Sequence, residues 1–195
     1  WQWNHNPMDE AWSLTERKGW LRLIANQAPN LYLARNTISQ RMEGPRCSAS
    51  ARIDISQMKD GDRAGMAAFN GHSGILTIAR DGKRLTLAQT ATQVHLSDRE
   101  KAVTKVDEEI IEVIDIKGKH IELRIDADFT PGQDMATFYY RTKGKEWTPI
   151  GRPYRMRFDY RLFFMGTRYA IFNYATKEKG GHIDVDHFDY TKENH

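Results

Sequence analysis

Cysteine is almost absent from this sequence. Cys47 is the single one among 195 residues, so no internal disulfide can form and cysteine usage does not indicate a compartment. Apolar runs are all far too short to span a membrane. The net charge of +3 comes from both signs mixed along the chain, without the basic tract that follows phosphates. We therefore expect neither a membrane nor a nucleic acid as a partner.

Familiar catalytic spacings are also missing. The chain has no serine nucleophile elbow, no phosphate-cradling glycine loop and no zinc-like spacing of His or Cys, and its seven His are scattered. We expect the chain by itself to hydrolyse nothing. It begins at Trp1 rather than at Met, which we interpret as an excised piece or a mature fragment of a longer protein.

The sequence also lacks sustained helical periodicity. Short apolar runs rich in Val, Ile, Thr, Phe, Tyr and Trp are punctuated by glycine, which is typical of an all-β protein. The length fits one domain, and no repeat or low-complexity linker divides it. The sequence predicts a two-sheet antiparallel β-sandwich, a single domain over residues 1–195.

The expected strands follow alternating patterns, with Asp81-Gly82 as a hairpin turn. Ala91–Asp107 is expected to be a loop or a weak pair of strands. The strands are expected at Gly19–Leu23, Ser48–Ile55, Arg63–Asn70, Gly74–Arg80, Arg84–Gln89, Glu108–Ile116, Lys119–Ala127, Ala136–Arg141, Tyr169–Tyr174 and Ile183–Phe188.

Two segments suggest a ligand or a partner. Leu31–Arg41 is expected to be extended and polar on both faces, with Asn36 and Gln40 on one of them, so it lies at an edge or meets a sugar or a protein. Four of the five Trp lie in the first twenty residues, where core packing is favoured over sugar stacking. If the domain binds sugar, we expect Trp147, Tyr169, Asn36 and Gln40 to provide the rings and the hydrogen bonds.

The closing stretch Phe163–Tyr190 carries the other candidates. Alternation places Asp184 and Asp186 on one strand face, where water, Arg, Lys or a metal ion must compensate their repulsion. We expect this strand to pair with the aromatic opening of the chain. A structural Ca²⁺ held by Asp186, Asp184, Asp9 and Asn6 would tie the two chain ends together.

A catalytic interpretation of the same stretch is less favoured. The spacing Asp184-x-Asp186-x-x-Asp189 is similar to that of sandwich glycosidases of the laminarinase type, but those have Glu at both ends. In a regular strand Asp189 also points away from the other two.

Phe163 and Phe164 are consecutive. On an extended chain they point opposite ways, so one ring faces out and a partner surface would recover its burial.

The sequence resembles a known family, the C-terminal concanavalin A-like β-sandwich of glycoside hydrolase family 43 enzymes. These enzymes are β-xylosidases and α-L-arabinofuranosidases. The same type is classed as carbohydrate-binding module family 91. The residues that carry the resemblance are Trp1-Gln2-Trp3-Asn4-His5-Asn6-Pro7, Trp12-Ser13-Leu14, Gly19-Trp20-Leu21-Arg22-Leu23, Ala34–Arg41, Asp60–Gly65 and Asp184-x-Asp186-x-Phe188-x-Tyr190.

The resemblance implies a jelly-roll sandwich that packs on a catalytic five-bladed propeller of the same polypeptide. It implies that Phe164, flanked by Phe163 and Arg168, reaches the rim of the sugar pocket. Xylan or arabinoxylan is the implied substrate, and a secreted or periplasmic location is expected. Met8 stands where relatives often have an Asp that is a candidate calcium ligand. The alternatives are an independent xylan-binding module and a sandwich glycosidase in its own right.

Overall fold

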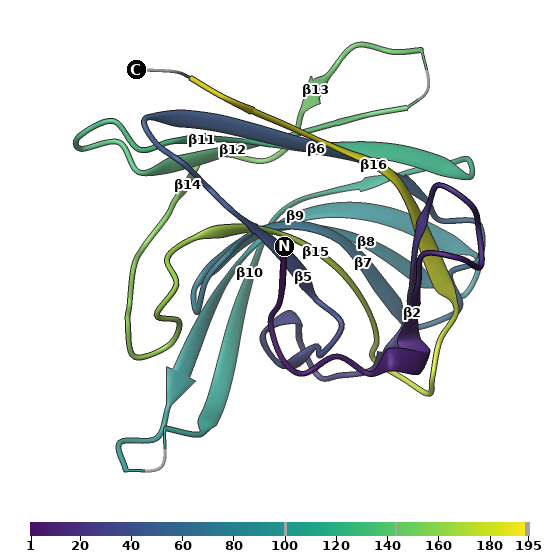
Figure 1. The fold of residues 1–195 in the computed structure, drawn as a ribbon, viewed down its shortest axis with the longest axis horizontal. Helices are drawn as coiled ribbons and strands as arrows, with labels where there is room; N and C mark the ends of the chain where they lie inside the picture. The colour runs from purple at the N-terminus through teal and green to yellow at the C-terminus, as the bar shows by residue number, and fades with distance from the viewer. Residues whose placement is uncertain (100, 143, 194–195) are drawn as a thin grey trace.

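Two stacked sheets form the computed structural model, which describes residues 1–99, 101–142 and 144–193 (Figure 1). The lower sheet in Figure 1 has the order β1-β5-β15-β7-β8-β9-β10, with β4 beside β15. The upper sheet has the order β13-β12-β11-β6-β16-β3-β2, with β14 beside β12. Among these described residues, every strand pair is antiparallel except β4 with β15. The predicted all-β, two-sheet sandwich is confirmed.

The strands of the lower sheet are β1 (Gln2–Trp3), β4 (Asn26–Gln27), β5 (Ile38–Arg41), β7 (Asp62–Phe69), β8 (Ser73–Asp81), β9 (Arg84–Leu96), β10 (Val103–Asp115) and β15 (Arg168–Ala175). Those of the upper sheet are β2 (Trp12–Ser13), β3 (Leu21–Ile24), β6 (Arg46–Asp54), β11 (His120–Asp128), β12 (Met135–Arg141), β13 (Thr148–Pro149), β14 (Tyr154–Arg155) and β16 (His182–Lys192). Two short 3-10 helices, η1 (Asp9–Ala11) and η2 (Leu31–Leu33), complete the fold, and no helix in the described ranges is long and apolar enough to cross a membrane.

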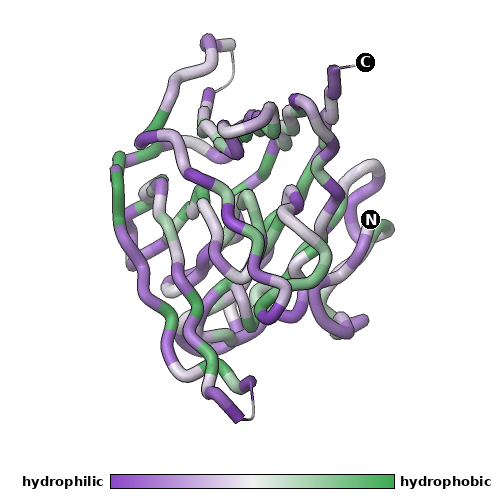
Figure 2. Tube along the Cα trace, turned by 90° about the vertical axis from the view of Figure 1, so that its left-hand side faces the viewer, coloured by the Kyte–Doolittle hydropathy of each residue, from purple (hydrophilic) through white to green (hydrophobic). Residues whose placement is uncertain are grey.

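The main core lies between the sheets. Hydrophobic and hydrophilic residues alternate along the strands, as Figure 2 shows, and the inward positions of β6 and β11 are buried. Ile53 and Leu123 from the upper sheet meet Met66 and Leu76 from the lower one in a single cluster. Burial of each such side chain contributes roughly 1.5–3 kcal/mol, so this layer is the main source of stability.

A second, smaller apolar cluster lies on the other face of β7 and β15. Phe69 and Phe172, which alternate with main-core residues, are fully buried there. Leu31 of η2 and Phe163 of the loop before β15 pack against this cluster. The lower sheet is therefore apolar on both faces in its middle, and the loops that cover it are positioned by that contact.

Of the two alternatives for residues 91–107, the pair of strands is correct, because much of this stretch belongs to the long hairpin of β9 and β10. Two other expectations about local structure are wrong. The segment 31–41 is extended only at β5, since η2 interrupts it. The closing strand β16 pairs with β3 and β6, whereas the aromatic opening β1 pairs with β5 in the other sheet. The opening segment still contacts β16 through a pair of rings, with the Trp1 and Phe188 centroids 4.6 Å apart.

Candidate functional site

An exposed aromatic segment, residues 156–167 between β14 and β15, stands out on the surface. We call it the aromatic loop. Phe158, Tyr160, Phe164 and Met165 in it are all exposed, and Phe164 is the most exposed at 81%. The ring of Phe163 turns the other way and packs on Phe69 at a centroid distance of 5.2 Å. Several large exposed apolar side chains on one surface loop are typical of a contact with another protein surface.

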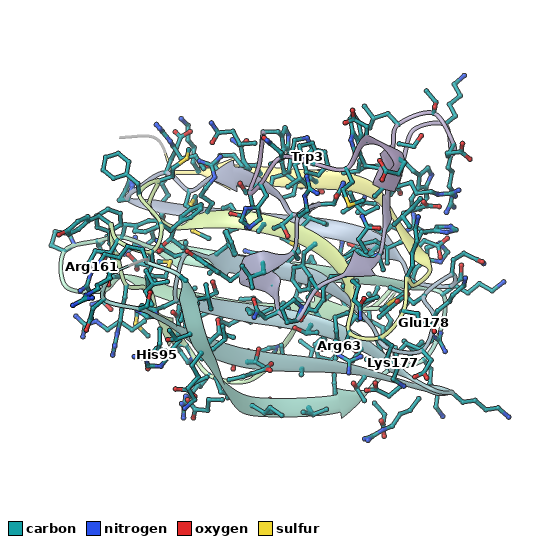
Figure 3. All side chains as sticks on the ribbon, turned by 90° about the horizontal axis from the view of Figure 1, so that it is seen from below. Trp3, Arg63, His95, Arg161, Lys177 and Glu178 are labelled. Atoms are coloured by element: carbon teal, nitrogen blue, oxygen red, sulfur yellow. The ribbon has the colours of Figure 1, made fainter. Side chains whose placement is uncertain are left out.

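Hydrogen bonds hold the aromatic loop in shape. The carbonyl of Asp159 accepts bonds of 3.0 Å from the backbone N–H groups of both Leu162 and Phe163. The Arg161 guanidinium donates to both carboxylate oxygens of Asp159 and holds the pKa of that carboxyl at about 2. Tyr32 donates to the carbonyl of Leu162 at 2.7 Å. Figure 3 shows Arg161 at the same end of the sandwich as His95, away from Arg63 and Lys177. The loop therefore presents its rings from an anchored base.

Arg168, predicted beside Phe164, follows this loop as the first residue of β15. Its side chain is buried and donates to the hydroxyl and the carbonyl of Ser39 at 2.9 and 3.4 Å. Burial lowers the pKa of Arg168. In the part of the chain that the structure describes, no carboxylate forms an ion pair with it. The guanidinium thus anchors β15 to β5 and keeps a charge that the described residues do not neutralise.

The four predicted sugar-binding residues are not gathered in one place. Tyr169 is fully buried and its hydroxyl contacts the Cys47 thiol at 3.2 Å, so its ring is not available to a sugar. Asn36 is buried as well, and its side-chain amide exchanges hydrogen bonds with the backbone of Met8. Gln40 lies half-buried on β5. Trp147 is on the opposite side, over the outer face of the upper sheet.

Trp147 borders a polar depression of about 310 Å³ on that outer face. Its indole ring lies over Arg141, with 4.3 Å between the guanidinium carbon and the ring centroid, and Arg124 is 5.9 Å away. We call this depression the serine trough, because two serines of β6 form its floor. It is lined by Ser48, Ala49, Ser50, Arg124, Arg141, Trp147, Asp189 and Thr191. Sequence reasoning identified the ring but missed the floor, because single serines on a strand carry no motif.

A second aromatic site lies where β1 and β2 meet the middle of β16, at Val185–Phe188. Trp1, Trp3, Trp12 and Trp20 line a groove of about 460 Å³ together with Leu14 and Phe188. Trp3 and Trp12 pack partly into the main core, as the core interpretation of the tryptophans predicted, but Trp1 remains 57% exposed. The lining is almost wholly apolar, which suits another apolar surface better than a ligand covered with hydroxyls.

The closing carboxylates are compensated by arginine. Asp184 accepts from Arg22 at 2.8 and 3.0 Å and from Arg17 at 3.1 Å, and Asp186 accepts from Arg52 at 3.2 Å. Burial by itself raises the pKa of Asp184, but the hydrogen bonds from the two arginines outweigh it and hold that pKa below its ordinary value. A glycosidase general acid needs a raised pKa, so Asp184 is unsuited to that role.

One detail of this stretch differs from expectation. The expected alternation turns Asp189 away from Asp184, but a bulge between Val185 and Phe188 shifts the register. Asp189 therefore pairs with Ser50 and lies on the same outer face as the other two carboxylates. The bulge brings Asp189 to the serine trough.

The predicted calcium ligands fit a metal poorly. Both oxygens of Asp184 are taken by guanidinium groups, and Asn6 and Asp9 are exposed, with the Asn6 carbonyl accepting from Arg35. Within residues 1–99, 101–142 and 144–193, no three His, Cys, Asp or Glu side chains form a group that could hold a metal ion. The calcium prediction stays untested. A chelator that lowered the melting temperature would support it, and an unchanged melting temperature would contradict it.

Residues 1–191 match the family model of the β-xylosidase C-terminal concanavalin A-like domain. A β-xylosidase of Formosa agariphila is 31% identical over 97% of this chain and 32% of its own length. Among solved structures, a bifunctional GH43-CE protein of Bacteroides eggerthii has a TM-score of 0.87 at 33% identity, with 100% of this chain and 24% of that one covered.

A second solved structure is similar. It is a GH43 glycoside hydrolase engineered to display both endo-xylanase and exo-arabinofuranosidase activity, with a TM-score of 0.86 at 29% identity. The match covers 96% of this chain and 37% of that enzyme. The chain thus spans between 24% and 37% of the length of these three relatives.

Proposed function

Because the chain belongs to the family of β-xylosidase C-terminal concanavalin A-like domains, we propose that it is the non-catalytic accessory domain of a family 43 glycoside hydrolase. The substrate we propose for the whole enzyme is xylan or arabinoxylan. The relatives support this division of labour, since this chain matches only 32% of the β-xylosidase from Formosa agariphila. A polysaccharide of this size points to an enzyme that works outside the cytoplasm, secreted or in the periplasm.

The aromatic loop is the surface by which the domain packs on its catalytic propeller. The observation that carries the proposal is the 81% exposure of Phe164 beside three further exposed apolar side chains on the same loop. Burial of one such ring recovers roughly 1.5–3 kcal/mol, which a partner surface would supply. Arg168 lies just behind the loop, and a carboxylate of the propeller would neutralise it. Phe164 itself would screen the sugar pocket from water at its rim.

Replacement of Phe164 by Ala tests the interface. The free energy of unfolding of the 195-residue chain should change by no more than about 0.5 kcal/mol, because the ring is exposed. In the full-length enzyme kcat/KM for an aryl xyloside should fall about tenfold, or ~1.4 kcal/mol of barrier. Denaturant unfolding of the chain and steady-state kinetics of the enzyme measure the two effects.

Phe163→Ala is the matched control. Its ring packs on Phe69, so this variant should lower the stability of the chain itself. A large loss of stability in Phe164→Ala, or unchanged turnover in the enzyme that carries it, contradicts the interface role.

Xylan binding is the second candidate function, and a specific feature favours it. The serine trough combines one aromatic ring with several hydrogen-bonding groups, which is the composition that sugar sites share. Affinity electrophoresis of the chain through soluble xylans and arabinans measures whether it binds, and unretarded migration in every gel would count against this function.

A further inference from the structure

The serine trough owes its shape to one strand. β6 lies in the middle of the upper sheet, and its outward residues next to β11 and β16 are Ser48 and Ser50. Across the sheet, Ser50 lies between Arg124 and Asp189, and Ser48 lies between Asp126 and Thr191. Each serine is shorter than its cross-strand neighbours on both sides, and the surface is hollowed along the two serines. Trp147 rises above its β12 side from the connection to β13.

The floor and one wall of the trough offer hydrogen-bonding groups that the protein does not use. Among the described residues, the side-chain hydroxyls of Ser48, Ser50 and Thr191 neither donate nor accept a hydrogen bond. Asp189 is 72% exposed, and the only basic side chain within 4 Å of its carboxylate in the part of the chain that the structure describes is His187, at 3.5 Å. A hydroxyl both donates and accepts hydrogen bonds, and both oxygens of a carboxylate accept them. This set of groups can therefore bind the hydroxyls of a ligand either as donors or as acceptors.

The opposite wall is charged but neutralised. Arg124 uses Nε and Nη2 on Asp126, at 2.6 and 3.0 Å, and Arg141 uses the same two atoms on Glu122, at 2.9 and 2.6 Å. The Arg124–Asp126 pair is bidentate, whereas both bonds of Arg141 go to a single oxygen of Glu122, and these bonds orient the two guanidinium planes. Within the described ranges, Nη1 of each Arg has no hydrogen-bond acceptor and is left as a donor. The plane of Arg141 supports the Trp147 ring at 4.3 Å. The wall is thus a rigid aromatic platform with donors beside it and little net charge.

From this arrangement we infer that the serine trough binds a neutral β-1,4-linked xylopyranose chain, with one sugar ring stacked on Trp147. A xylopyranose ring presents flat C–H faces that suit an indole and equatorial hydroxyls that suit Ser48, Ser50, Asp189 and the two Nη1 atoms. The identity of the sugar rests on the proposed function, whereas the place and the mode of binding come from the trough.

Charge and polarity set this site apart from the other aromatic site. The arginines are paired and Asp189 adds a negative charge, so the trough does not favour an acidic polymer. The tryptophan groove at Trp1 would leave sugar hydroxyls without partners because its lining is apolar. Trp1 is therefore a natural control, since it is an exposed indole at a place where no sugar is expected.

The test is calorimetric titration of the 195-residue chain with a linear, unsubstituted xylo-oligosaccharide. Trp147→Ala should weaken binding about tenfold, equal to ~1.4 kcal/mol. Ser50→Val removes a floor hydroxyl without disfavouring a strand, and it should also weaken binding. Trp1→Ala should bind as the parent chain does. Raised salt should leave the affinity unchanged, because the ligand is neutral.

Melting curves establish that each variant is folded, and Ser50→Val keeps the test decisive if Trp147→Ala does not fold. Absence of binding by the parent chain, equal binding by Trp147→Ala and Ser50→Val, or loss of binding only in Trp1→Ala overturns the inference. Binding that requires an acidic polysaccharide and falls steeply with salt overturns it too. The titration uses the chain alone, so its failure is distinguishable from a failure of the Phe164 experiment, which measures turnover of the full-length enzyme.

Discussion

Asp184→Ala is expected to lower the free energy of unfolding by about 3–5 kcal/mol, the usual consequence of removing one partner of a buried ion pair. The Asp184 side chain is only 4% exposed, and the guanidinium of Arg22, 20% exposed, donates two bonds to it. Arg17 adds a third bond from the loop after β2. Without the carboxylate, two guanidinium groups remain close together at the junction of β3 and β16.

Asp186→Ala is the matched control for this variant. Asp186 is two residues further along β16, also pairs with an arginine, and is 30% exposed. Exposed pairs contribute about 0–1 kcal/mol, so its loss should have a small effect. Urea unfolding of both variants measures the difference. Equal effects of the two substitutions would show that burial of Asp184 does not determine the stability of this end of the sandwich.

The same network makes stability depend on pH in a known direction. The folded-state pKa of Asp184 is lowered, and that of Asp54, which also accepts from Arg17, is about 2 although burial alone would raise it. A group with a lowered folded-state pKa contributes stability above its unfolded value and loses it as pH falls through the folded value. Stability of the chain should therefore decline below about pH 4, and the decline should be shallower in Asp184→Ala.

The strand order around this network shows what sequence patterns can predict. Alternation in β6, β8 and β11 placed the core-facing side chains, and Asp81-Gly82 marked the turn between β8 and β9. These features depend on residues a few positions apart. The face shared by Asp184 and Asp186 followed from the same period of two, and so did the opposite directions of Phe163 and Phe164.

The contacts that complete the sites depend on residues far apart in the chain. Arg17 lies 167 residues from Asp184, and the pattern of charges did not single it out among the many Arg and Lys. Tyr169 was predicted to provide a ring for a sugar, but Cys47 and the upper sheet bury it. The direction of Asp189 depended on a bulge that no local pattern marks. Packing partners, rather than propensities, decided each of these positions.

Gly65→Ala is the second substitution expected to have a large effect. Gly65 lies in the middle of β7, between Phe172 of β15 and Thr77 of β8, with a φ of +153°. A Cβ added there would be 1.9 Å from the backbone carbonyl oxygen of Leu76. Because that oxygen belongs to the neighbouring strand, it cannot move away without disturbing the ladder between β7 and β8. Backbone strain of ~1–3 kcal/mol and overpacking of ~1–3 kcal/mol add up to a cost of several kcal/mol.

Gly82→Ala separates the two contributions. Gly82 also has a positive φ, +60°, but nothing lies within 4 Å of the Cβ that would be added. Its replacement should therefore lower the free energy of unfolding only by the backbone strain of a positive φ, roughly 1–2 kcal/mol. Thermal unfolding of both variants checks the prediction, and equal losses would mean that β7 and β8 can separate at Gly65. The close approach matters for function, because β7 also carries Phe69, on which Phe163 and the base of the aromatic loop rest. A chain weakened at Gly65 should therefore also hold Phe164 less firmly toward the propeller that we propose as its partner.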